Sequence, residues 1–220
     1  MVSICNKLIF IAITAIAIGF GFEPVPPEES EHGGVVVDVV GGSKSYETTR
    51  FLRQELVPVL EKYGHKIIVN FHPYGPYGKT HCSNKGPFNS NSCTCQHGKD
   101  ECMKNYLQAC VMQHVSNTTL QIRTVTCVQG RTEFYGIIKA CIGGTLPNKV
   151  GRIILECAKG SEGPKLMYEH GEEARATVSN DVTYVPWIAF NKQRSIPAEY
   201  NLERVICNKL PKPPPLTCPR

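Results

Sequence analysis

The sequence predicts an α/β fold that carries a helical, disulfide-stapled insertion. A β-branched apolar run, a segment with helical periodicity and a second β-rich run follow one another early in the chain. Strand, helix and strand in close succession are typical of a βαβ unit with a parallel strand pair. Helical periodicity then dominates the middle of the chain, which is also rich in cysteine. We expect one domain over residues 35–210, with the insertion at about residues 75–178.

The start of the chain predicts a secretory signal peptide over residues 1–21. Lys7 gives a short positive start, and Leu8 to Phe22 is an apolar run that ends in small residues. This run is short for a span of about 20 residues and has no stop-transfer charges after it, so we expect cleavage near Gly21. A retained membrane anchor is the alternative. The polar, Pro- and Glu-rich residues 22–34 predict a flexible leader.

The βαβ unit is expected between residues 35 and 74. Residues 35–40 are an apolar run typical of a strand that is buried on both faces. Residues 45–63 have a helical period with one apolar face, where Ser45 could cap the helix and Pro58 predicts a kink. Residues 66–74 form the second β-rich run.

The rest of the domain alternates between irregular, helical and strand-like segments. Residues 74–95 are rich in Gly, Pro, Asn and Ser, which predicts irregular structure pinned by cysteines. Helical periodicity recurs at residues 100–114, 134–142, 150–158 and 165–176. The remaining elements are a strand at residues 182–190, a turn at Asn191-Lys192, a helix at residues 199–207 and a Pro-rich tail at residues 211–220.

The cysteines agree with export from the cell. Cys5 leaves with the signal peptide, so ten of the eleven cysteines remain, an even number. Many cysteines behind a signal peptide predict disulfides formed in an oxidising compartment. The ten are Cys82, Cys93, Cys95, Cys102, Cys110, Cys127, Cys141, Cys157, Cys207 and Cys218. Asn117 begins an N-glycosylation triplet, Asn117-Thr118-Thr119, which has a meaning only in a secreted chain.

The charge distribution excludes some classes of function. The formal net charge of +5 at pH 7 is modest and scattered along the chain. Nucleic-acid-binding domains carry basic stripes interleaved with aromatic residues, which this sequence lacks, so we expect no nucleic-acid partner. After signal cleavage, no stretch is long and apolar enough to span a membrane.

The densest motif runs from Cys95 to Cys110 and reads CQHGKDECMKNYLQAC. It fits the pattern CQHGxxECxxNxxxxC at every fixed position, which are Cys95, Gln96, His97, Gly98, Glu101, Cys102, Asn105 and Cys110. On this motif the chain resembles the GILT family, the gamma-interferon-inducible lysosomal thiol reductases. The resemblance extends from the strand at Val35 to the Tyr184–Ile188 segment, YVPWI. It implies a thioredoxin-like fold with a helical insertion.

The spacing within the motif restricts the disulfides. Cys102, Tyr106 and Cys110 lie on one helix face, and eight residues separate the two cysteines by about 12 Å. A disulfide needs Cα atoms within about 7 Å, so each cysteine must pair with another segment.

Two alternatives to structural disulfides are a zinc site and a redox pair. The zinc site would be built from Cys82, Cys93, Cys95, His97 and Cys102, and the redox pair would be Cys93 and Cys95. The oxidising compartment and the even cysteine count favour disulfides, with no bound metal or cofactor. His97 is then expected to be a hydrogen-bonded structural residue.

The resemblance implies a CxxC motif at the start of the first helix, and this chain lacks it. The two cysteine positions fall on Ser45 and Thr48. A thiol ionises at about pH 8.5 and is easily tuned lower, whereas these hydroxyls cannot form a mixed disulfide. No cysteine lies between Cys5 and Cys82, so no shift of register restores the motif. We therefore predict no catalytic residues.

The resemblance also implies a cis-proline at Pro186 that faces the degenerate site. A proline at an ordinary strand start is the alternative. A groove that keeps this proline could still bind extended peptide by strand addition.

The sequence thus predicts a secreted, non-catalytic GILT-like protein that binds a protein or cell-surface partner. The first alternative is a residual thiol-disulfide oxidoreductase that uses other cysteines, such as Cys93 and Cys95. The second is a metal-binding or structural protein. We expect an extracellular protein, with the lysosome as the alternative destination.

Overall fold

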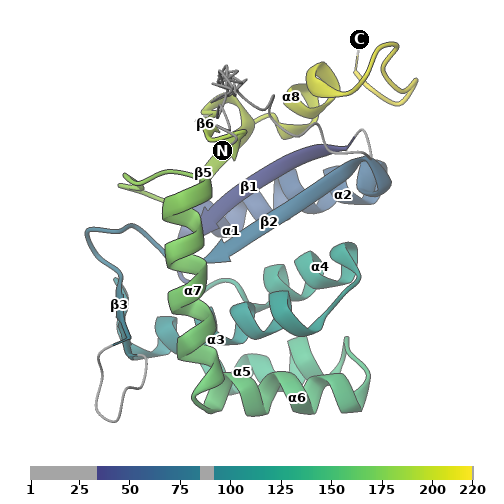
Figure 1. Ribbon diagram of the computed structural model, residues 1–220. Helices are drawn as coiled ribbons and strands as arrows, with labels where there is room; N and C mark the ends of the chain where they lie inside the picture. Colours follow the sequence, from purple (N-terminus) through teal and green to yellow (C-terminus); the bar gives the residue numbers. More distant parts are fainter. Residues whose placement is uncertain (1–33, 85–91, 220) are drawn as a thin grey trace, which may run out of the picture. The chain divides into compact units, whose positions relative to one another are not determined.

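The computed structural model of the protein describes residues 34–84 and 92–219 (Figure 1). The predicted signal peptide and all but the last residue of the predicted leader lie outside the described residues. Within the described part, no helix is long and apolar enough to cross a membrane.

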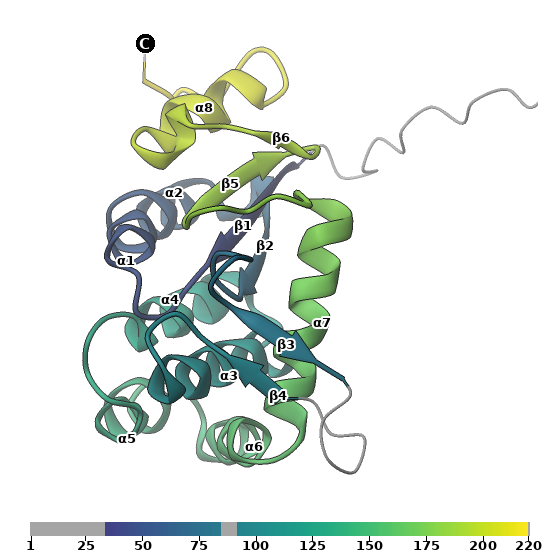
Figure 2. The ribbon, with the colours of Figure 1, turned by 90° about the vertical axis from the view of Figure 1, so that its left-hand side faces the viewer.

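The domain is built on a four-stranded sheet with the strand order β2-β1-β5-β6 (Figures 1 and 2). Its strands are β1 (Val35–Gly41), β2 (Ile67–Pro73), β5 (Trp187–Phe190) and β6 (Gln193–Arg194). The predicted βαβ unit is confirmed, since β1 and β2 are parallel. β5 runs antiparallel on the other side of β1. The predicted turn at Asn191-Lys192 joins β5 to β6, and both residues have positive φ, as a tight hairpin requires.

The predicted helix between β1 and β2 contains a π-helical stretch. It consists of α1 (Tyr46–Phe51), η1 (Leu52–Leu56) and α2 (Val57–Tyr63), and η2 (Gly64–Lys66) follows it. In η1 the N–H of Val57 donates to the carbonyl of Leu52. The wider turn lies just before Pro58, whose ring would crowd the carbonyl of Gln54 in a regular α-helix. The predicted apolar face is buried, comprising Phe51, Leu52, Leu56, Val59, Leu60 and Tyr63.

A set of helices fills the chain between β2 and β5. They are α3 (Lys99–His114), α4 (Thr118–Val128), α5 (Phe134–Ile137) with the π-helical η4 (Ile138–Gly143), α6 (Asn148–Lys159) and α7 (Glu162–Thr177). The sequence predicted all of them except α4. Its four threonines lower its helix propensity, but Ile122, Val125 and Val128 bury one face and so stabilise it.

Two predictions about extended structure were wrong. Residues 74–95 were expected to be irregular, yet β3 (His81–Ser83) and β4 (Ser92–Thr94) form an antiparallel pair in which Cys82 faces Cys93. The strand expected over residues 182–190 begins only at Trp187, directly after a cis peptide bond. The last elements are η5 (Pro197–Glu199) and α8 (Leu202–Lys209).

All ten cysteines of the described residues are paired in five disulfides. The pairs are Cys82–Cys93, Cys95–Cys102, Cys110–Cys157, Cys127–Cys141 and Cys207–Cys218. As the helical spacing required, Cys102 and Cys110 pair with different segments. Four of the five disulfides hold the helical segment and its flanking hairpin together, and the fifth ties the tail to α8.

Candidate functional site

The candidate site lies where β1 ends and α1 begins. Ser45 is the N-cap of α1, and its hydroxyl oxygen accepts a hydrogen bond from the N–H of Thr48 at 3.2 Å. The same hydroxyl donates to the carbonyl oxygen of Val185 at 3.4 Å. The helix start and the segment before β5 therefore meet at the Ser45 side chain.

Thr48, three residues after Ser45 in α1, has no exposed surface. Its hydroxyl oxygen has no hydrogen-bond partner among the described residues. The backbone beside it is tightly packed: a Cβ added at Gly41 would lie 2.6 Å from the Thr48 methyl group and 2.9 Å from the Phe71 ring. Ser45 is thus half-buried at the helix start, and Thr48 is enclosed.

The peptide bond between Val185 and Pro186 is cis, as the sequence predicted. Pro186 is buried and directly precedes β5. Because Val185 accepts the Ser45 hydrogen bond, the cis-proline segment lies against the helix start. The structure therefore brings Ser45 and the segment of Pro186 together, although 140 residues separate Ser45 from Val185 in the sequence.

A small open pocket of about 230 Å³ surrounds this meeting point. Its lining comes from four segments and comprises Ser45, Tyr46, Glu47, Pro76, Lys79, Gln96, His97, Thr183, Tyr184 and Val185. The sequence did not predict the contributions of Pro76, Lys79 and Thr183. They reach the pocket through loops, where no periodicity marks a shared surface.

Residues of the motif from Cys95 to Cys110 hold segments next to the pocket in place by hydrogen bonds. The Asn105 side chain accepts from the N–H of Ser43 at 2.9 Å and donates to the carbonyl of Tyr74 at 3.0 Å. It therefore fixes both the loop after β1 and the residue after β2. Ser43 adds a second link, since its hydroxyl donates to the carbonyl of Glu101.

The same motif also shapes the start of α3. The Glu101 carboxylate accepts from the N–H of His97 at 2.7 Å, which satisfies a donor that precedes the helix. Gly98 has φ of +80°, a conformation that favours glycine. Cys95 and Cys102 close this turn covalently.

Gln96 and His97 are exposed members of the motif, and both line the pocket. His97 was expected to be a hydrogen-bonded structural residue. Its backbone N–H donates to Glu101, and the residue also lines the pocket. The alternative zinc site is not formed by thiolates, because its four cysteines are in disulfides.

Comparison with known proteins identifies the family. Residues 36–145 match the model of the family described as gamma interferon inducible lysosomal thiol reductase (GILT). GILT-like protein ZK669.3 of Caenorhabditis elegans is 31% identical over 191 residues, covering 85% of this chain and 86% of that protein. The chain belongs to the GILT family.

Other relatives of this GILT chain include the gamma-interferon-inducible lysosomal thiol reductase of Mus musculus. It is 25% identical over 173 residues, covering 79% of this chain and 65% of that protein. Among solved structures, the oxidoreductase NmDsbA1 from N. meningitidis aligns with a TM-score of 0.45 at 10% identity, over 79% of this chain and 78% of that one. The GILT chain has a mixed α/β fold with several disulfides, and its relatives include thiol reductases.

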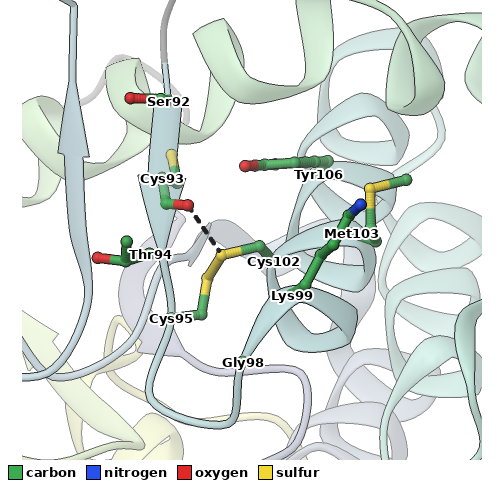
Figure 3. A pocket seen from close by; sticks show the side chains of 9 residues that line it. All are labelled: Ser92, Cys93, Thr94, Cys95, Gly98, Lys99, Cys102, Met103 and Tyr106. Atoms are coloured by element: carbon green, nitrogen blue, oxygen red, sulfur yellow. Dashed lines mark hydrogen bonds between the residues drawn. A yellow bond between two sulfur atoms is a disulfide. The ribbon is translucent and has the colours of Figure 1, made fainter. Parts of the chain in front are cut away.

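A second cavity of about 470 Å³ lies between β4 and the first turns of α3 (Figure 3). The Cys95–Cys102 disulfide forms part of its wall, and Tyr106 and Met103 of α3 form another part. Cys93 and Cys95 also line it, but each is bonded to a different partner. The suggested pair of Cys93 with Cys95 is therefore not a disulfide of this structure.

Proposed function

We propose that this GILT chain is a secreted, non-catalytic protein that binds an extended segment of a protein partner beside Pro186. The single observation that carries the proposal is the pairing of Ser45 with the cis-proline segment. A hydroxyl group stands at the helix start, where the thiol reductases of this family need a nucleophilic sulfur. Among the described residues that line this pocket there is no cysteine.

The chemistry of the two hydroxyls supports the loss of reductase activity. Disulfide exchange needs a thiolate that attacks sulfur and a second thiol that resolves the mixed disulfide. The Ser45 hydroxyl instead serves as a helix cap and as a donor to Val185. Thr48 is enclosed, so no substrate atom reaches it.

The lining of the pocket supports binding of an extended peptide. Tyr46 is 75% exposed and Tyr184 is 40% exposed, so two aromatic rings stand at its edges. Exposed aromatic side chains supply contact area at a low cost in conformational entropy. Glu47 and Lys79 add one charge of each sign. The backbone of residues 183–185 runs along one wall and offers polar groups to a partner strand.

The alternative function is a residual oxidoreductase activity centred on Cys95 and Cys102. The observation that favours it is their position in the wall of the larger cavity, which makes this disulfide reachable. A substrate thiolate would attack one of these sulfurs, which forms a mixed disulfide and releases the other cysteine as a thiolate. That thiolate would then attack a second disulfide and rearrange it by exchange.

The two functions predict different thiol chemistry. The test labels free thiols of the purified full chain before and after mild reduction, and measures insulin reduction at acidic and neutral pH. We expect all ten cysteines to stay blocked and insulin to remain intact. A Cys95–Cys102 pair that opens under mild reduction and sustains turnover supports the alternative and overturns the proposal.

Binding is tested separately with a peptide that cannot exchange disulfides. The probe is a fluorescent, reduced and alkylated insulin B chain, and its anisotropy is followed as the protein is added. Tyr46→Ala is expected to weaken binding at least tenfold, because Tyr46 lines the pocket. Tyr135→Ala is the matched control, since Tyr135 is 78% exposed on α5 away from the pocket. Equal affinities of the two variants would contradict the proposed groove.

We place the protein outside the cell, with the lysosome as the alternative destination. Asn117, the sequon residue, is exposed, and its side-chain oxygen caps α4 by accepting from the N–H of Leu120 at 2.8 Å. Glycan attachment to the amide nitrogen leaves this oxygen available for the cap. A glycosidase-sensitive mass in the secreted fraction, lost in Asn117→Gln, supports this placement, and retention of the chain inside cells contradicts it.

A further inference from the structure

Three metal-ligating side chains converge between the sheet and α7, on elements that lie side by side in Figure 2. His72 comes from β2, while His170 and Glu173 are three residues apart on α7. Residues at this spacing share one face of a helix. The sequence predicted no metal here, because 98 residues separate the two histidines.

The distances between the three donor atoms suit a metal ion. The Nδ1 atoms of His72 and His170 are 3.4 Å apart, and the Glu173 Oε2 atom lies 3.9 Å from the first and 4.0 Å from the second. The circle through a triangle with these sides has a radius of about 2.2 Å, and zinc binds nitrogen and oxygen ligands at about 2.0–2.2 Å. One point is therefore at bonding distance from all three atoms without movement of the backbone.

Without an ion, this arrangement leaves polar groups poorly satisfied. His72 is 2% exposed, and its Nε2 atom has no hydrogen-bond partner among the described residues. Its polar contacts therefore lie on the Nδ1 side, where two ring nitrogens that face each other share at most one proton. A metal ion on this side would be a stronger partner for the buried Nδ1 atom, while Nε2 is without a described partner in either case.

We propose that His72, His170 and Glu173 form a binding site for a divalent transition metal of the Zn²⁺ type. Two imidazoles and one carboxylate are a donor set that zinc takes with three protein ligands and one open position. Glu173 is 59% exposed, so a water molecule reaches the fourth position from the surface. The site stands apart from the pocket at Ser45 and does not depend on the proposed function.

The bound ion would fix α7 to β2. α7 and the end of β2 already approach closely, since a Cβ added at Gly171 would collide with the ring of Tyr74, the residue after β2. A metal that bridges the strand and the helix adds stability to the folded state only, because the unfolded chain does not bring these ligands together. The bound ion would therefore stabilise the folded domain.

A second group of the same residue types serves as the comparison. His114, Cys157 and Glu162 also lie close together, but the Cys157 sulfur is bonded to Cys110. A disulfide sulfur is not a thiolate, so only a histidine and a carboxylate 3.0 Å apart remain there. This pair provides a control that has similar groups and lacks the third ligand.

The test titrates Co²⁺ into the full chain after removal of metals with a chelator. We expect one Co²⁺ per chain, with the visible absorption of a four-coordinate site, and displacement by Zn²⁺. His170→Ala removes a direct ligand and is expected to weaken affinity by about 100-fold or more. Glu173→Ala is expected to weaken it as well. Glu172→Ala and His114→Ala are the controls and should retain the parent's affinity.

The melting temperature gives a second measurement. Zn²⁺ should raise it in the parent and in both control variants, but not in His170→Ala. The proposal is overturned if the parent binds no stoichiometric Co²⁺, if His170→Ala or Glu173→Ala binds as tightly as the parent, or if His114→Ala abolishes binding.

Discussion

The Ser45 hydroxyl donates to the carbonyl oxygen of Val185 at 3.4 Å, across a sequence separation of 140 residues. This contact joins the first helix of the domain to the cis-proline segment before β5. Under the proposed function, this hydroxyl group stands at the position from which the thiolate of a thiol reductase would act.

Restoring the two sulfurs should restore the chemistry. Ser45→Cys combined with Thr48→Cys places a half-buried thiol at the helix N-terminus, where the helix dipole and the N–H of residue 48 stabilise a thiolate. We expect measurable insulin reduction from the double variant and none from the parent. Ser45→Cys alone should form a mixed disulfide without turnover, because no resolving thiol is present. A folded double variant that stays inert would contradict the placement of the site.

Ser45→Ala should destabilise the fold. The variant loses the cap on the N–H of Thr48 and the donor to Val185, and loss of a helix cap costs about 1 kcal/mol. The free energy of unfolding, measured by urea denaturation, checks this. Ser92→Ala, at an exposed position on β4, is the control and should change the value by less than about 0.5 kcal/mol.

Thr48→Val should stabilise the fold by about 1 kcal/mol, since it removes a buried hydroxyl without a partner and keeps the shape of the side chain. The same urea denaturation measures the gain. A loss of stability would show that the Thr48 hydroxyl is hydrogen-bonded in solution, for example to a buried water.

Asp38 should make stability depend on pH. Burial raises the pKa of Asp38 above its ordinary value of 3.8, although the hydrogen bond from Asn70 opposes the shift. The folded state therefore binds a proton more tightly than the unfolded state does. The contribution of Asp38 to the free energy of unfolding is full below pH 3.8 and is lost as pH rises through the raised pKa.

Asp38→Asn removes this ionisation and keeps an oxygen for Asn70. Urea denaturation at several pH values should show that the variant gains stability over the parent as pH rises from acidic to neutral. Asp181→Asn, at an exposed position, is the control and should show no such trend. A constant difference between Asp38→Asn and the parent would contradict the assigned pKa shift.

The tail disulfide should contribute measurably to stability. Cys207→Ser with Cys218→Ser opens a loop of 11 residues, for which the chain-entropy relation gives about 2–3 kcal/mol. We expect that loss in the free energy of unfolding, together with release of the tail from Tyr63, whose hydroxyl donates to the carbonyl of Thr217. Leu216→Ala changes an exposed tail residue and should be neutral. An unchanged stability of the double variant would show that the tail is held by its other contacts.

Local patterns predicted most of the fold, because apolar periodicity reports directly which face of an element is buried. α4 was missed because its threonines oppose helix formation, and only packing of Ile122 and its neighbours reverses that preference. β3 and β4 were missed because strands of three residues are too short to show a period. Their pairing is marked by the Cys82–Cys93 disulfide, which sequence spacing alone does not assign.

The candidate site could be predicted in part. Ser45, Thr48 and Pro186 follow from their order along the chain and from the family motif. That Gln96 and His97 reach the same pocket could not be predicted, since their position depends on how α3 packs against the end of β1. The approach of His72 to His170 could not be predicted either, because it also depends on long-range packing, which leaves no local pattern in the sequence.

Asn105 holds the loop before Ser45 through backbone groups, and Cys95–Cys102 holds the turn before α3. Neither contact involves the side chain at position 45 or 48. In evolutionary terms, the proposed exchange of the two thiols would leave the frame that orients the site in place. A lineage that made this exchange in single steps would keep a folded chain at each step and a groove open to selection for a different task.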